Sequence, residues 1–71
     1  MASHTDRIRH HTENFNKVLK SFGPQSHYTT YAFFQMQAAL MGKSEKNIRI
    51  WAESEMERLK AIALEIVSEE D

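Results

Sequence analysis

Glycine and proline, the residues that most often end helices, occur in this chain at only two places, Gly23-Pro24 and Gly42. The rest of the sequence is rich in Glu, Ala, Leu, Met and Lys, which favour helix over strand. The two interruptions therefore predict an all-α fold of three helices. Their expected spans are about residues 5–22, 27–42 and 45–68. Connections this short make consecutive helices antiparallel neighbours within a single domain, residues 1–71.

The middle stretch is the one place where a strand would also suit the residues. Residues 28–34 are mainly aromatic and β-branched, as strands often are. A lone strand has nothing to pair with, however, and residues 35–41 continue with strong helix formers, so we predict one helix capped by Ser26. This helix is apolar on nearly all sides, which is typical of a central helix with neighbours on two sides.

The aromatic residues are divided between an expected core and an expected partner surface. We expect Phe33, Phe34 and Trp51 inside the fold, because a short chain needs its large side chains for its core. Tyr28 and Tyr31 are candidates for a rim that contacts a partner protein, since a tyrosine hydroxyl can stay in water while its ring packs.

The third helix is predicted to be longer than its neighbours. At about 1.5 Å per residue it would be about 37 Å long, against about 24 Å for the second helix. Its last turns therefore extend beyond the rest, and they carry apolar residues that a small protein normally covers. We predict that a second copy covers them, so that a homodimer completes the fold; the alternative is that the helix ends early and folds back. The residues assigned to self-association are Leu59, Ile62, Ile66 and Val67.

The length and the lack of cysteine favour the same conclusion. A chain of 71 residues is near the lower limit at which one core outweighs chain entropy, and such chains often rely on disulfides, a metal or a second copy. Cysteine is absent, which excludes disulfides and fits a reducing compartment. The first residues are polar and no apolar run approaches the roughly 20 residues that span a bilayer, so we expect a cytoplasmic protein with no membrane partner.

Charge is distributed unevenly along the chain. Residues 1–50 carry seven Lys or Arg against three Asp or Glu, whereas residues 51–71 carry two against seven. The net charges of these segments are therefore +4 and −5, although the whole chain is close to neutral at −1. Such asymmetry is typical of a basic binding surface with an acidic tail, of two ends that attract each other in a dimer, or of a solvated helix face followed by an acidic terminus.

No pattern in the sequence predicts catalysis, a cofactor or a metal site. There is no glycine-rich phosphate loop and no cysteine nucleophile, and Glu53, Glu55 and Glu57 point around a helix rather than to one side of it. His10 and His11 are neighbours that point in different directions, and no other histidine lies three or four residues from either. His11 falls on the apolar face of the first helix, where we expect it to pack.

The connection at Gly42 resembles a helix-turn-helix DNA-binding motif over residues 38–51. In that motif a small residue lets the helices approach, a glycine four later takes a left-handed turn, a serine caps the next helix and apolar residues pack it inward. The residues that carry the resemblance are Ala38, Gly42, Ser44, Ile48 and Trp51. Gln37 and Lys43 depart from it, because both positions are usually apolar, and a plain helical hairpin would share much of the pattern.

The resemblance implies a set of DNA contacts at the start of the third helix. Lys43 would lie on a phosphate. The residues that would face the major groove are Ser44, Glu45, Lys46, Asn47 and Arg49. Because few basic residues lie near the turn and a specific binder engages many phosphates, a dimer would be needed to double this surface.

Two functions follow from these patterns. The first is a small non-enzymatic helical regulatory or inhibitor protein, of the phage or plasmid type, which binds another protein and acts as a homo-oligomer. The alternative is a small helix-turn-helix transcriptional regulator that binds DNA through residues 38–51.

Overall fold

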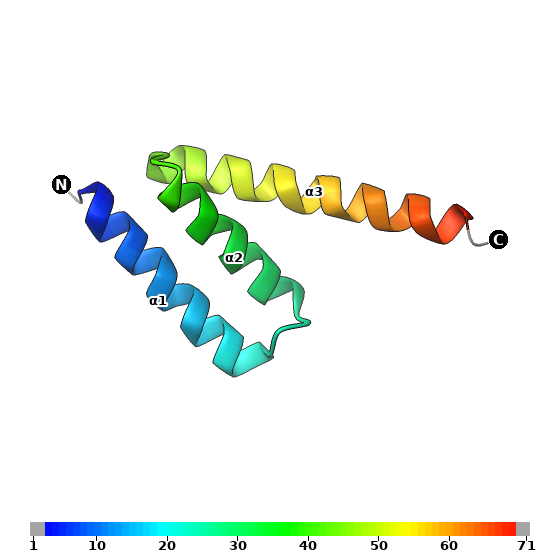
Figure 1. Cartoon of the computed structure of the whole chain (residues 1–71), viewed down its shortest axis with the longest axis horizontal. Helices are drawn as coiled ribbons and strands as arrows, with labels where there is room; N and C mark the ends of the chain where they lie inside the picture. Colours follow the sequence, from blue (N-terminus) through cyan, green and yellow to red (C-terminus); the bar gives the residue numbers. More distant parts are fainter. Residues whose placement is uncertain (1–2, 70–71) are drawn as a thin grey trace.

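The computed structural model describes the backbone of residues 3–69 and the side chains of residues 3–66. It contains three helices and, within the described residues, no strand: α1 (His4–Phe22), α2 (His27–Leu40) and α3 (Glu45–Glu69) (Figure 1). The predicted all-α fold is confirmed, with each helix boundary within two residues of its expected place. The helices pack in sequence, α1 beside α2 and α2 beside the first half of α3.

Side-chain and backbone caps fix where the first two helices begin and end. The Ser3 hydroxyl accepts a hydrogen bond from the Asp6 N–H at 3.1 Å, and the Asp6 carboxylate accepts one from the Ser3 N–H at 3.4 Å. The Ser26 hydroxyl caps α2 by accepting from the Tyr28 N–H at 3.2 Å, as predicted. Gly23 ends α1 with φ 84° and ψ 170°, a conformation that only glycine adopts readily.

The core is small and is built mainly from alanines. Its buried apolar residues are Ala32, Ala38, Ala39, Ile48 and Ala52, and Ile48 is the one large side chain among them. Ile8 of α1 and Trp51 of α3 pack against this cluster from either side. Small residues allow α2 to approach both neighbours closely, which explains how a chain of this length forms two helix contacts with so few large buried side chains.

The prediction that Phe33 lies inside the fold is wrong, because 38% of it is exposed. Phe34 and Trp51 are half-buried, with ring centroids 6.0 Å apart in an edge-to-face pair. The reason is the arrangement of the helices, whose Cα atoms occupy a flat envelope of 51 × 25 × 13 Å. A layer this thin does not enclose large rings, so they lie along the edges of the helix contacts.

The second half of α3 extends beyond α1 and α2 (Figure 1). Every side chain from residue 57 to residue 66 is exposed, whereas Ile48 and Ala52 in the first half are buried against α2. The predicted overhang is therefore confirmed. In the part of the chain that the structure describes, no helix combines the length and the apolar character needed to cross a membrane.

Candidate interaction surfaces

One face of α3 runs from the core of the protein onto its exposed half. Ile48 and Ala52 lie on this face, and it continues through Glu55, Leu59, Ile62 and Ile66 in alternating steps of four and three. That spacing is the seam of a helix that packs along another helix. α2 covers the seam at Ile48, whereas Leu59, Ile62 and Ile66 remain 46%, 44% and 52% exposed. We name the last three residues the α3 seam.

The predicted self-association residues are thus brought together in part. Leu59, Ile62 and Ile66 lie on a single face of the described helix. The side chain of Val67 lies outside the described residues. The clustering follows from helical spacing, and the exposure follows from the length of α3, whose second half extends beyond α2.

A shallow groove flanks the α3 seam on one side of α2. Phe34, Glu55, Arg58, Leu59 and Ile62 line its outer part. Its inner part continues along the α2–α3 contact and is lined by Phe33, Phe34, Gln37, Leu40, Met41, Trp51, Glu55 and Arg58. The groove is apolar at its floor and charged at its rim, where the Arg58 guanidinium donates to the Glu55 carboxylate at 2.6 Å. An apolar floor with a charged rim is typical of protein interfaces.

The two tyrosines predicted to contact a partner lie on a different groove of the α2–α3 contact, together with Glu53, Met56 and Glu57. Tyr28 is exposed and its ring packs beside Phe22, with the centroids 5.0 Å apart. Tyr31 is half-buried. Burial raises the pKa of the Tyr31 hydroxyl above 10.0, the Glu53 carboxylate raises it further, and Arg49 lowers it.

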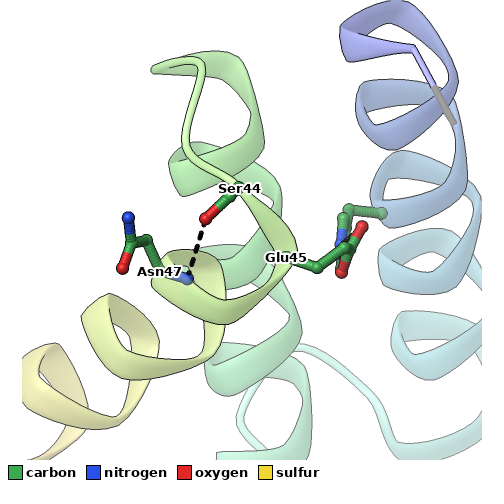
Figure 2. A network of polar contacts seen from close by, with 4 residues as sticks. Ser44, Glu45 and Asn47 are labelled. Atoms are coloured by element: carbon green, nitrogen blue, oxygen red, sulfur yellow. Dashed lines mark hydrogen bonds and ion pairs between the residues drawn. The ribbon is translucent and has the colours of Figure 1, made fainter. Parts of the chain in front are cut away.

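The turn between α2 and α3 has the local geometry that we predicted from the helix-turn-helix resemblance. Gly42 has a φ of 84°, and its N–H donates to the Ala39 carbonyl at 3.0 Å. The Lys43 N–H donates to the Ala38 carbonyl at 3.2 Å. These two bonds satisfy the last carbonyls of α2, an arrangement that requires a left-handed residue at the glycine. The Ser44 hydroxyl then accepts from the Asn47 N–H at 3.4 Å, which caps α3 (Figure 2).

The residues predicted to contact DNA divide into two groups. Ser44, Lys46, Asn47 and Arg49 are exposed, and Lys43 is half-buried. Glu45 does not join them, because its side chain points away from Ser44 and Asn47 toward α1 (Figure 2). Glu45 is exposed as well, but its side chain lies on a different side of α3 from the other residues of this set. It lies in the first turn of α3 on the side that meets α1.

The contact that holds Glu45 is one that the sequence pattern did not reveal. Its two carboxylate oxygens lie 3.2 Å and 3.3 Å from Nε2 of His11. Only 6% of His11 is exposed, and its Nδ1 is buried without a hydrogen-bond partner among the described residues. The position of His11 on the apolar face of α1 signals its burial, but nothing in the sequence signals a partner 34 residues away.

In the described part of the chain, no three His, Asp or Glu side chains come together as a metal site would require. The sequence matches no protein-family model, and neither a curated protein nor a solved structure is significantly similar to the chain. Function is therefore inferred from the surfaces alone.

Proposed function

We propose that the protein is a non-enzymatic helical regulator or inhibitor that acts by binding another protein and works as a homodimer. The observation that carries this proposal is the α3 seam, which continues, exposed, the face of α3 that is buried at Ile48 and Ala52. Exposed apolar faces of this kind mark interaction sites on small proteins. A second copy supplies a matching face of the same length.

The energetics indicate that the interface is larger than the α3 seam. Covering a half-exposed Leu or Ile contributes about 1 kcal/mol, so the seam side chains of two copies contribute about 6 kcal/mol. Association costs about 4–15 kcal/mol in lost motional freedom. The free energy gained by covering the α3 seam alone therefore barely offsets the cost of association. A stable dimer also needs contacts in the groove beside the seam. Leu40 and Met41, at the inner end of that groove, are more than half exposed and available to contribute.

Substitution of one seam residue tests the dimer. Ile62→Asp places a charge in the proposed interface and is expected to shift the protein toward monomer in sedimentation velocity or light scattering. Ile50→Asp is the matched control, because Ile50 is 49% exposed and Ile62 is 44% exposed, but Ile50 lies off the seam. Equal masses for both variants and the unmodified chain at every concentration would contradict the proposal.

The second protein is proposed to bind at the groove lined by Tyr28, Tyr31, Glu53, Met56 and Glu57, which we name the tyrosine groove. This groove lies apart from the α3 seam. Tyr28 is exposed there beside Glu53 and Glu57, and tyrosine is among the residues that contribute most to protein interfaces. Tyr28→Ser is expected to abolish capture of the partner from a native lysate without changing the mass of the dimer. Capture that survives in Tyr28→Ser while Ile62→Asp abolishes it would place the partner on the seam instead.

DNA binding is the second candidate function, and the geometry of the Gly42 turn favours it. The glycine, the Ser44 cap and the exposed Lys46 and Arg49 have the places that the motif assigns to them. Affinity for duplex DNA is expected to fall steeply with salt and to weaken further in the Lys46→Ala, Arg49→Ala double variant.

The matched control removes two lysines far from the turn. Lys17 and Lys20 are exposed in the second half of α1, so Lys17→Ala with Lys20→Ala makes the same change in net charge. DNA affinity that falls equally in both double variants would indicate unspecific attraction. Absence of binding at low salt would remove this function.

A further inference from the structure

We propose that the two copies pair through antiparallel α3 helices, so that Arg58 of each copy lies beside Glu65 of the other. This inference rests on the proposed dimer and adds its geometry. In the pairing, Leu59 of one copy lies opposite Ile62 of the second copy, and the two α3 seams form one continuous contact.

The arrangement of charges beside the α3 seam favours this direction. Arg58 and Glu65 are seven residues apart, about two helical turns, so both flank the seam on the same side. When Leu59 lies opposite Ile62 of the second copy, Arg58 of the first copy and Glu65 of the second copy are offset by two residues. This offset is about 3 Å along the helix axis. Both side chains are long enough to span that offset. The contact occurs twice because the two copies are related by symmetry.

A parallel pairing brings like charges together instead. Residues 65–71 contain four acidic residues and no basic one. Two parallel α3 helices would bring the two Glu65 carboxylates to the same level of the dimer. The antiparallel pairing separates these two carboxylates and places each one near Arg58 of the other copy. Like charges across an interface disfavour a pairing, so the charge pattern selects the antiparallel one.

The shape of the protein leaves space for the second helix. All side chains from residue 57 to residue 66 are exposed, so a helix can lie along this part of α3 without displacing α2. In the antiparallel alignment, Ile66 of the second copy lies opposite Glu55. Glu55 belongs to the groove that Phe34 and Trp51 line, which provides an apolar floor for the end of the second helix. The pairing thus covers both the α3 seam and the groove beside it.

Distances between spin labels test the direction of pairing. The chain has no cysteine, so Lys46→Cys and Lys60→Cys each introduce one labelling site. Both positions are exposed and lie off the α3 seam. Antiparallel pairing predicts about 45 Å between labels at residue 46, and parallel pairing predicts about 20 Å. Labels at residue 60 are expected within about 20 Å in either case, so they report whether the dimer exists.

The outcomes separate this inference from the proposed dimer. A short distance at residue 60 with a long one at residue 46 supports the antiparallel pairing. Short distances at both positions overturn it and leave the dimer intact. No intermolecular distance at residue 60 overturns both.

A charge substitution gives a second test that does not depend on labels. Glu65→Lys places two lysines beside two arginines in the antiparallel pairing, so we expect the dimer to dissociate about tenfold more readily. In a parallel pairing the same change removes repulsion and strengthens the dimer. The control is Glu57→Lys, which makes the same charge change on the side of α3 opposite the seam and is expected to leave the dissociation constant unchanged. A tighter Glu65→Lys dimer would overturn the inference.

Discussion

Nε2 of His11, buried in α1, lies 3.2 Å from the carboxylate of Glu45 in the first turn of α3. α1 and α3 contact each other much less than either contacts α2, so this pair links two helices that otherwise meet mainly through their common neighbour. The pair also turns Glu45 away from the exposed face of the Gly42 turn. It therefore contributes both to the fold and to the charge that this turn presents.

Removing the imidazole is expected to destabilise the protein. His11→Ala deletes a side chain that is only 6% exposed and leaves Glu45 without this partner, so we expect the free energy of unfolding to fall by about 1–3 kcal/mol. Urea denaturation followed by circular dichroism measures the change. His10→Ala is the matched control, because the neighbouring His10 is exposed, and its effect is expected to stay within about 0.5 kcal/mol.

A double-mutant cycle isolates the contact itself. If His11 and Glu45 interact as described, His11→Ala and Glu45→Ala are expected to be non-additive by at least about 0.5 kcal/mol. Additive effects of the two substitutions would show that the pair contributes nothing beyond the packing of His11.

Two nearby isoleucines of α3 are expected to respond differently to the same substitution. Ile48 is 1% exposed and is the largest fully buried side chain, so Ile48→Val is expected to lower the free energy of unfolding by about 1 kcal/mol. Ile50, at 49% exposure, is expected to tolerate the same change within about 0.5 kcal/mol. Denaturation midpoints of the two variants provide the comparison, and a reversed order would contradict the position of α3 on α2.

Gly42→Ala tests the backbone of the α2–α3 turn. The added methyl group would lie at an ordinary contact distance of 3.7 Å from Cε1 of His4, so crowding is not the reason for a loss of stability. The reason is the positive φ of 84°, which is unfavourable for alanine. We expect the free energy of unfolding to fall by about 1–2 kcal/mol. Lys43→Ala serves as the control, since no residue other than glycine has a positive φ among the described residues. Equal stability of the two variants would show that the turn does not need glycine.

Tyr31 is expected to make the stability depend on pH in the alkaline range. Burial raises the pKa of its hydroxyl above 10.0 in the folded protein, so the folded state holds this proton more tightly than the unfolded state does. The contribution of Tyr31 to the free energy of unfolding is fully present below pH 10. It is lost as the pH rises through the raised pKa of the folded state. Urea denaturation on both sides of pH 10 measures the loss. Tyr31→Phe is expected to reduce it, whereas Tyr28→Phe, which keeps Tyr31, is expected to retain it.

The helix boundaries were predictable because they depend on residues close together in the sequence. Gly42 and the serine caps act within one turn of themselves, and Ser26 and Ser44 hold the positions that their spacing predicts. The hydrogen bond from the buried Thr29 hydroxyl to the Gly23 carbonyl, at 2.6 Å, was not predicted. That contact arises only once α2 has folded back.

The misplaced residues depend on how the helices are oriented. Phe33 was expected inside because a compact bundle encloses its aromatic rings, but the helices form a flat layer instead. The contact of Glu45 with His11 was not predicted, because the helical position of Glu45 alone does not show that His11 lies beside it. The directions of α2 and α3 depend on the close approach of alanines such as Ala38 and Ala52, which a pattern of apolar and polar residues does not encode.

Sedimentation equilibrium of the unmodified chain tests the central proposal most directly. The α3 seam predicts a reversible dimer at tens of micromolar, with a mass twice the 8.3 kDa of the chain. The fraction of dimer should rise with concentration and should fall in Ile62→Asp. A single species of 8.3 kDa throughout this range would contradict the proposal that a second copy covers the α3 seam.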